Sequence, residues 1–347
     1  MNSLTTTSLR TIPKDATAFE ARVSGDHSRW LFNKCATTTR DFCMARPVTT
    51  PGPAAPHGGA IRLIAIDIDG TLLDSKRRIP EANQQAILKA TAQGIEVVLA
   101  TGRAFHHACP IADRLEIPLI LIVSNGALVK RSDGKTLACR SIPRHLARDL
   151  VVATRPIREG AALIFDRPDA RQYTYERIDW SHKERKWYYE LYKVYMTEVE
   201  SLEVALDEEP VQLTFNGSVK EMRKLNIYIR KLESARNLTL TRTEYEDRNF
   251  SLLDITAPGC SKGATLADFA SRRNVPPGEI MAVGDNLNDL EMLQFVGYPV
   301  VMGNAVPKLK EMADQYGWPL TSDYEHDGLA QAIKVHMSKN RPAPATS

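Results

Sequence analysis

From residue 61 the chain alternates short apolar runs with amphipathic stretches. The apolar runs "IRLIAI", "IEVVLA" and "PLILIVS" predict three strands, and the later "EIMAVG" and "YPVVMG" predict two more. "PEANQQAILKATAQG" begins with a proline and an acidic residue and ends at Gly94, which is typical of a helix. "FHHACPIADRLEI" predicts a helix that breaks or ends near Pro110, and another helix is expected from about Asn288 to Phe295. Strands that alternate with helices indicate parallel βαβ units.

Between about residues 144 and 256 this pattern changes, because the content of charged and aromatic residues rises. The amphipathic "VKEMRKLNIYIRKLES" alternates there with the strand-like segments "VQLTFNG" and "LTLTRT". The mixture predicts a separate α+β domain at 145–255. It would be inserted after the third strand of a parallel-sheet α/β core formed by 61–144 and 256–337.

The two ends of the chain differ from the rest. Residues 1–60 are rich in Ser, Thr and Arg and finish in the linker-like "RPVTTPGPAAPHGG", so a disordered extension is expected there, with a flexible tail at 338–347. A transit peptide is the alternative for the first residues, and Met44 before the linker is an alternative start. Four acidic residues argue against a transit peptide: Asp15, Glu20, Asp26 and Asp41.

The composition is that of a globular protein and gives no sign of a nucleic-acid-binding or membrane-spanning protein. A hydrophobic share of 43% and a charged share of 25% over 347 residues are ordinary for a globular protein, and a net charge of +3 does not imply a nucleic-acid partner. The longest apolar run, 117–123, is too short to cross a membrane. The five cysteines contain no CxxC pair, which favours reduced thiols and a cytoplasmic location: Cys35, Cys43, Cys109, Cys139 and Cys260.

Polar residues follow the predicted strands directly. Because the carboxyl ends of parallel strands meet at one edge of a sheet, these residues are expected to line one shared pocket. They are Asp67, Asp69, Thr101, Asn125 and Asp285.

This pocket poses a problem of charge. Asp67 and Asp69 lie two residues apart, and Asp285 and Asp289 in "GDNLND" add two more carboxylates. Four carboxylates in one place repel one another unless a divalent cation joins them, and all-oxygen ligands suit Mg²⁺. The sequence therefore predicts a magnesium site.

Other residues of the pocket suit a phosphoryl group. Lys262 in "SKG" supplies a fixed positive charge, and Thr101 supplies a hydroxyl and a backbone N–H at a turn. An aspartate can attack phosphorus and form an aspartyl-phosphate. A second carboxyl two residues away can protonate the leaving oxygen and then deprotonate the hydrolytic water.

Four motifs in order give the chain a family resemblance over about 61–337. "DIDGTLL", "ATGR", "SKG" and "GDNLNDLEML" resemble the motifs of the haloacid dehalogenase superfamily of phosphatases. The specific resemblance is to the Cof-like group, which carries a large C2-type cap domain after the third strand. "SNGA" at 124–127, "VVMGNA" ending at Ala305 and "DGLA" near Gly328 are also familiar from this group.

The resemblance implies a Rossmann-like parallel-sheet core and an α+β cap that selects the substrate. It implies a Mg²⁺-dependent phosphomonoester hydrolase that acts on a small phosphorylated metabolite, such as a sugar phosphate. Asp67 would be the nucleophile and Asp69 the acid/base. The implied phosphate-binding residues are Thr101, Gly102, Asn125, Lys262 and Asn288. The implied ligands of Mg²⁺ are the Asp67 carboxylate, the Asp69 carbonyl and the Asp285 carboxylate, with Asp289 a further candidate that supports the site beside Asn288.

Several residues allow two interpretations. Arg103 can reach the substrate or pair with an internal carboxylate. Asn125 can contact the substrate or satisfy the turn at Gly126. His106 and His107 are expected on a helix surface and not as metal ligands, and Cys260 is expected to be a packing residue.

The stretch "YTYERIDWSHKERKWYYELYKVY" at 173–195 interleaves aromatic and basic residues, as a nucleic-acid surface can. Its acidic residues make the charge mixed. We therefore expect the aromatic rings to face the core of the cap and the charges to face water, without a nucleic-acid partner.

Three other functions remain open at this point. A phosphotransferase such as a phosphomutase would pass the phosphoryl group to a sugar hydroxyl instead of water. A receiver-like phosphorylation switch would lack the acid/base two residues after the first aspartate. A binding protein without catalysis would use the aromatic surface of the cap.

Overall fold

The computed structural model describes residues 59–339, apart from the side chains of residues 184, 247, 338 and 339. The predicted extension up to residue 58, the alternative start at Met44 and the predicted tail from residue 340 lie outside the described residues. The described residues fall within one compact unit of the chain. Within them, no helix combines the length and the apolar character needed to cross a bilayer.

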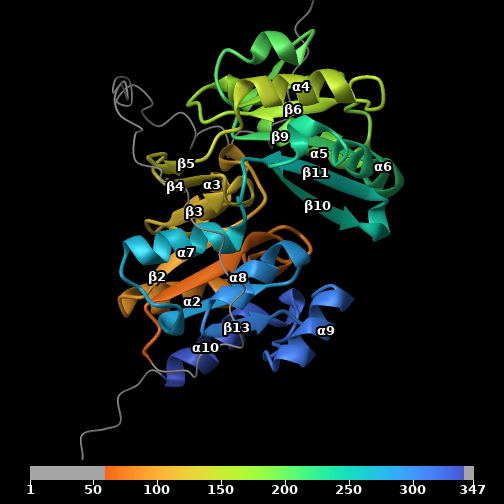
Figure 1. Ribbon diagram of the computed structural model, residues 1–347. Coiled ribbons are helices and arrows are strands. Elements are labelled where there is room, and N and C mark those ends of the chain that lie inside the picture. The colour runs from red at the N-terminus through yellow and green to blue at the C-terminus, as the bar shows by residue number, and fades with distance from the viewer. Residues whose placement is uncertain (1–58, 340–347) are drawn as a thin grey trace, which may run out of the picture. The chain divides into compact units, whose positions relative to one another are not determined.

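A seven-stranded sheet, the core sheet, has the strand order β13-β12-β1-β2-β3-β4-β5 (Figure 1). Neighbouring strands from β13 to β3 pair in parallel. All five strands predicted from the sequence are present in this parallel part. Their bounds are β1 Leu63–Asp67, β2 Glu96–Ala100, β3 Ile120–Val123, β12 Ile280–Gly284 and β13 Tyr298–Val301.

Two strands that the apolar pattern did not predict complete one edge of the core sheet. β4 (Leu128–Arg131) and β5 (Thr136–Cys139) form an antiparallel hairpin beside β3. The chain turns at Gly134, whose φ of +89° is accessible to glycine without strain. The Asp133–Gly134 pair is a hairpin signal that could have revealed these strands. The sheet is therefore parallel at its centre and antiparallel at this edge.

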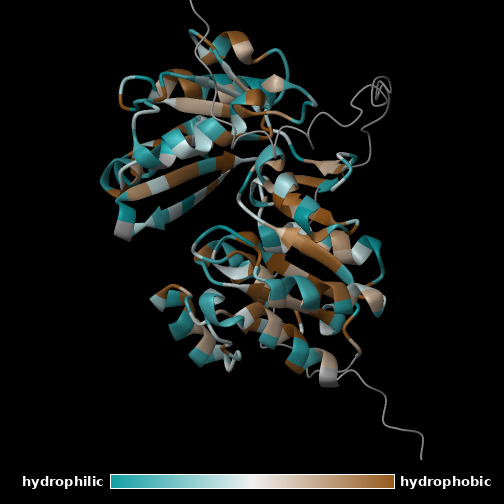
Figure 2. Ribbon diagram, turned by 180° about the vertical axis from the view of Figure 1, so that it is seen from behind, coloured by the Kyte–Doolittle hydropathy of each residue, from teal (hydrophilic) through white to brown (hydrophobic). Residues whose placement is uncertain are grey.

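Helices cover both faces of the core sheet because its strands are apolar on both sides. Ile64 and Ile66 of β1 pack toward α2, α3 and α10, whereas Leu63 and Ala65 pack toward α7, α8 and α9. Strand segments are among the most hydrophobic parts of the chain in Figure 2. The bounds of the helices are α2 Glu81–Ala92, α3 Phe105–Ala112, α7 Lys262–Arg272, α8 Leu290–Phe295, α9 Pro307–Tyr316 and α10 Gly328–Lys339.

Helix α3 ends near Pro110, as the sequence predicted, although the proline itself is not the last residue. The proline lies inside α3, and the helix continues to Ala112 and then into a 3₁₀ turn at Asp113–Leu115. The proline lies in the second turn of this short helix, so it removes only one intrahelical hydrogen bond before the helix ends.

A second sheet, the cap sheet, lies within the predicted insertion, which follows β5 of the core sheet and not the third strand as predicted, because the β4–β5 hairpin comes between them. Its six strands have the order β10-β11-β9-β6-β7-β8. Helices α4 and α6 pack aliphatic side chains, including Leu150 and Leu225, on one face of this sheet. The bounds are α4 Arg144–Thr154, β6 Ala161–Ile164, β7 Tyr173–Glu176, α5 Lys183–Tyr192, β8 Met196–Glu198, β9 Gln212–Gly217, α6 Val219–Ile229, β10 Thr239–Tyr245 and β11 Phe250–Thr256.

The other face of the cap sheet carries a cluster of aromatic side chains. Tyr173 and Tyr175 of β7 are buried in it, together with Tyr192 of α5 and Ala104 from the core. The prediction that these rings face the core of the cap is therefore only partly right, because they form a separate layer that residues of the core also enter. Arg185 in the same stretch is buried as well, where it donates hydrogen bonds to Asn216.

His106 corrects another expectation. It was expected on the surface of its helix, yet only 2% of its surface is exposed. Its ring lies 5.4 Å from the ring of Tyr195, and its Nε2 is 3.1 Å from the hydroxyl of Tyr188. The cap covers this face of α3. The sequence of α3 alone could not reveal this, because the covering residues lie far away along the chain. His107 lies beside it, with its ring 4.3 Å from that of Tyr192.

One ion pair is fully buried in the cap. The Nη2 of Arg158 lies 2.5 Å from the Oε1 of Glu176, and each side chain is 1% exposed. The other oxygen of Glu176 accepts a hydrogen bond from the backbone N–H of Leu202. Removing one partner of a buried pair leaves the other charge uncompensated.

We predict that Glu176→Gln lowers the free energy of unfolding by about 3–5 kcal/mol, because Arg158 then keeps a buried charge without its counter-ion. The measurement is urea unfolding followed by circular dichroism. The matched control is Glu233→Gln, whose partner Arg236 is exposed, with an expected loss below about 1 kcal/mol. Equal losses in the two variants would contradict the prediction.

Candidate active site

The predicted pocket forms where the parallel strands end. Asp67 is the last residue of β1 and pairs in register with Ala100 at the end of β2. Asp285 directly follows β12, the neighbour of β1 on its other side. The carboxyl ends of the strands therefore bring the aspartates and Thr101 to one edge of the core sheet, as the sequence predicted.

Lys262 is the central cation of the site. It is the first residue of α7 and is 1% exposed. Its Nζ donates hydrogen bonds to Asp67 Oδ1 at 2.6 Å and to Asp289 Oδ1 at 2.7 Å. Burial disfavours its charge, but the Asp289 and Asp67 carboxylates outweigh that effect and raise the pKa of Lys262 above its ordinary value. The lysine therefore stays charged and holds both aspartates in place.

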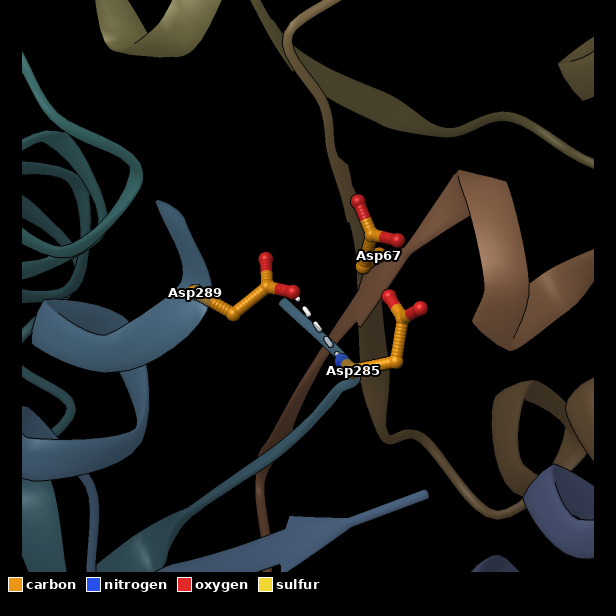
Figure 3. Close-up of side chains that lie close together, drawn as sticks. All are labelled: Asp67, Asp285 and Asp289. Carbon is orange, nitrogen blue, oxygen red and sulfur yellow. Dashed lines mark hydrogen bonds between the residues drawn. The ribbon is translucent and has the colours of Figure 1, made fainter. Parts of the chain in front are cut away.

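Three carboxylates gather around this lysine. Oxygens of Asp67, Asp285 and Asp289 lie within 4.8 Å of one another (Figure 3). Burial raises the pKa of Asp67 to about 7, with Lys262 opposing the rise and Asp289 adding to it. Burial and repulsion from Asp67 also raise the pKa of Asp285 well above its ordinary value. One lysine is thus not enough to keep all three carboxylates ionised.

The hydrogen bonds divide the three carboxylates by role. Both oxygens of Asp289 are occupied, since Oδ1 accepts from Lys262 and Oδ2 accepts from the backbone N–H groups of Asp285 and Asn286 at 3.0 Å. Asp285 Oδ1, by contrast, is a buried oxygen without a hydrogen-bond partner. A buried, unsatisfied carboxylate oxygen beside a second carboxylate suits an oxygen-preferring divalent cation.

The loop after β1 is closed around Asp285. Gly70 has a φ of +84°, and a Cβ at this position would lie 2.2 Å from Asp285 Oδ2, so only glycine fits. Asn304 donates a hydrogen bond to the carbonyl of Gly70 at 2.8 Å, and its Nδ2 lies 3.4 Å from Asp285 Oδ2. Asn304 had no predicted role, although the segment "VVMGNA" that contains it is familiar from the related family.

Asp69 pairs with Arg103, as one of the two interpretations of this arginine expected, and contact of Arg103 with a substrate stays a prediction. The Nε and Nη2 of Arg103 donate to the two carboxylate oxygens of Asp69 at 2.6 and 2.5 Å. Burial disfavours the charge of Asp69, but Arg103 holds its pKa below the ordinary value. Asp69 is therefore a carboxylate here. Arg103 also donates to Nε2 of His107 at 2.5 Å.

Thr101 is buried at the end of β2. Its backbone N–H donates to the carbonyl of Ile122 at 2.8 Å, so the expectation that this N–H faces a phosphoryl group is wrong. The Thr101 hydroxyl oxygen accepts from the N–H of Arg103 at 3.1 Å and keeps its own proton to donate. Gly102 packs against Asn125, because a Cβ at Gly102 would lie 3.0 Å from Asn125 Oδ1.

Asn125 joins the pocket to the cap. Its φ of +50° places it in the left-handed region directly after β3. Its Nδ2 donates to Asp254 Oδ2 at 3.1 Å, and Nδ2 of Asn288 lies 3.4 Å from its Oδ1. The side chain of Asn125 thus bonds to the cap and not to the backbone of the turn at Gly126, and its contact with a substrate stays a prediction.

Asp254 is a residue that the motifs did not reveal. It lies in β11 of the cap sheet and also accepts a hydrogen bond from the hydroxyl of Thr214 at 2.7 Å. Burial raises its pKa to about 6, and the hydrogen bond from Thr214 opposes the rise. A lone acidic residue in the apolar strand "FSLLDIT" was the available signal.

We predict that Asp254→Asn changes the pH dependence of stability. A pKa raised to about 6 means that the folded protein binds this proton more tightly than the unfolded chain, so the carboxyl favours folding as pH falls from about 7 toward 4. Near pH 8 the variant should be more stable than the wild type, with a free energy of unfolding that is higher by up to about 3 kcal/mol. This difference should shrink below about pH 6. Urea titrations across this range measure it, and a difference that does not change with pH would contradict the prediction.

Comparisons with known proteins agree with this geometry. The model of the haloacid dehalogenase-like hydrolase family matches residues 64–333. The phosphatase YwpJ of Bacillus subtilis is 31% identical over 79% of this chain and 99% of its own length. The HMP-PP phosphatase of Serratia proteamaculans is 30% identical over 73% of this chain and 88% of its own length.

The solved structures include a phosphatase of the haloalkanoate (HAD) enzyme superfamily from Bacteroides thetaiotaomicron. It is 27% identical, with a TM-score of 0.65 over 81% of this chain and 97% of that one. This chain therefore belongs to the haloacid dehalogenase-like hydrolase family, and it is one of the Cof-like phosphatases of that family.

Proposed function

We propose that this phosphatase is a Mg²⁺-dependent phosphomonoester hydrolase that acts through an aspartyl-phosphate on Asp67. The observation that carries the proposal is the buried Asp67 carboxylate at the end of β1, held by Lys262 beside the unsatisfied Asp285. A small phosphorylated metabolite is proposed as the substrate, as the name of the relative from Serratia proteamaculans suggests for that protein. The free thiols of Cys109, Cys139 and Cys260 support a cytoplasmic location.

The residues present fit the proposed metal. Asp67, the backbone carbonyl of Asp69 and Asp285 would hold Mg²⁺, because Asp285 offers a free buried oxygen. Asp289 was a further candidate ligand, but we assign it a positioning role, since both of its oxygens accept hydrogen bonds within the protein. When bound, Mg²⁺ supplies positive charge to the equatorial phosphoryl oxygens and offsets the excess of carboxylates.

The first step transfers the phosphoryl group to the protein. A carboxylate oxygen of Asp67 attacks phosphorus while the bond from phosphorus to the leaving oxygen breaks, and Asp69 gives that oxygen a proton. Lys262 and the hydroxyl of Thr101 stabilise the negative charge on the phosphoryl oxygens, with Gly102, Asn125 and Asn288 lining the same side. The product of this step is the Asp67 aspartyl-phosphate and a free alcohol.

The second step hydrolyses the aspartyl-phosphate. Water attacks phosphorus, its proton passes to Asp69, and the bond from phosphorus to Asp67 breaks to release phosphate. The pair with Arg103 keeps Asp69 ionised, which suits this base role. The first step needs the protonated form, so Arg103 has to release Asp69 when the substrate binds.

We predict that Asp67→Asn lowers kcat/KM by more than about 1000-fold while the protein stays folded, because the variant lacks the nucleophile. Phosphate release from p-nitrophenyl phosphate and from a panel of phosphorylated metabolites measures the activity. The matched control, Asp314→Asn, changes an exposed aspartate of α9 and should keep wild-type activity. Activity of Asp67→Asn within a few-fold of wild type would refute the assignment.

The same assay separates hydrolysis from phosphotransfer. A phosphomutase would consume the substrate and form a phosphorylated isomer without releasing phosphate.

Metal removal provides an independent prediction. EDTA should abolish phosphate release, and excess Mg²⁺ should restore it, because Lys262 alone does not keep Asp67, Asp285 and Asp289 all ionised and a divalent cation would. Full activity in EDTA after exhaustive dialysis would contradict the proposed dependence on Mg²⁺. The role of Asp67 would then be tested separately by the Asp67→Asn variant.

A further inference from the structure

A pocket of about 330 Å³ lies between the loop after β1 and the cap, lined by Ser75, Arg77, Lys183, Trp187 and Arg248. Three of these five residues are cationic. Among the lining side chains that the structure describes, none is a carboxylate. The proposed mechanism uses none of the five residues.

One series of contacts connects this pocket to the acid/base residue. Arg103 pairs with Asp69 and donates to His107. The ring of His107 lies 6.4 Å from that of Trp187, and the guanidinium carbon of Arg77 lies 3.5 Å from the centre of a Trp187 ring. Arg77 also acts electrostatically on Asp69. Trp187 of the pocket is therefore connected to Asp69 through His107 and Arg103.

The other wall of the pocket lies at the end of β10. The guanidinium carbon of Arg248 lies 5.4 Å from the ring centre of Tyr245, at the end of β10. Burial raises the pKa of Tyr245, with the charge of Asp69 adding to the rise and Arg103 opposing it. One wall of the pocket is thus connected to Asp69 through Arg103 and His107, and the turn after β10 forms the other wall.

The backbone holds two of the cations in place. Arg77 has a φ of +59° in a tight turn, where its N–H donates to the carbonyl of Asp74 at 2.9 Å. A non-glycine residue in this region persists only where its surroundings hold it, and the Trp187 ring supplies part of that support. Lys183 is the first residue of α5, so the positive end of the helix dipole adds to its charge.

We infer that this pocket binds a second anionic group of the substrate, a phosphate or a carboxylate on the leaving group. The inference rests on the proposed function and narrows its substrate class to phosphate monoesters that carry another anion. Lys262 binds the phosphoryl group that reacts, and Arg77, Lys183 and Arg248 provide a separate cationic site for the other end. Because these cations are partly exposed, the preference should weaken as salt is added.

The test compares matched substrates that differ in the second anion. Phosphate release is measured for fructose 6-phosphate against fructose 1,6-bisphosphate, and for glycerol 3-phosphate against 3-phosphoglycerate. The wild type should prefer the more anionic member of at least one pair by about tenfold or more in kcat/KM. A preference in the first pair identifies a phosphate, and one in the second pair identifies a carboxylate.

Variants that remove a positive charge then test whether this pocket causes the preference for the more anionic substrate. Lys183→Gln and Arg248→Gln should each lower it by at least about threefold, mainly through KM, and the double variant should abolish most of it. The matched controls Lys220→Gln and Arg230→Gln remove exposed cations from the α6 region of the cap and should leave the preference intact.

The outcomes separate this inference from the proposed function. A wild type that hydrolyses p-nitrophenyl phosphate through Asp67 but shows no preference within either pair would overturn the inference alone. So would a preference that survives in the double variant. A folded wild type that releases phosphate from none of the compounds would overturn both.

Discussion

The buried ammonium of Lys262 is the interaction on which the rest of the site depends. An unpaired ammonium in a protein interior costs several kcal/mol, and here Asp67 and Asp289 offset that cost with hydrogen bonds of 2.6 and 2.7 Å. The lysine lies at the start of α7, so this one group joins that helix to the end of β1 and to the turn before α8. Asp289 in turn receives the backbone N–H of Asp285. The position of the proposed nucleophile and the shape of the acidic cluster therefore follow from one buried charge.

The cap is connected to the same loops that carry the proposed phosphate-binding residues. Asp254 of the cap sheet binds Asn125 directly after β3, and Tyr188 of α5 contacts His106 directly after the turn that contains Thr101. A third contact joins Lys130 at the edge of the core sheet to Asp166 at 2.5 Å. These contacts mean that a movement of the cap changes the surroundings of the reacting groups. In the proposed mechanism, a cap coupled in this way would exclude water during phosphoryl transfer.

The residues that could be predicted share a simple property. Asp67, Thr101 and Asp285 each stand directly after an apolar run, and parallel strands bring such positions together. The residues that could not be predicted depend on what lies across space. Asp254 is a single acid in an apolar strand of another sheet, and His106 is buried only because the cap covers it. The hairpin of β4 and β5 was missed for a different reason, since its short strands lack a strong apolar alternation and its turn was the only local signal.

The sequence by itself determined the five parallel strands of the core sheet, the separate α+β segment between β3 and β12 and the set of acidic and basic side chains at the strand ends. These features depend on hydrophobic periodicity and on the direction of the backbone, which are local properties. Only the tertiary structure decided which charges pair. Lys262 reaches Asp67 across 195 positions of sequence, and Arg103 reaches Asp69 across 34. Electrostatic energy depends on distance and burial in space, so the ionisation of Asp69, the unsatisfied oxygen of Asp285 and the cationic pocket beside them emerge only in the folded chain.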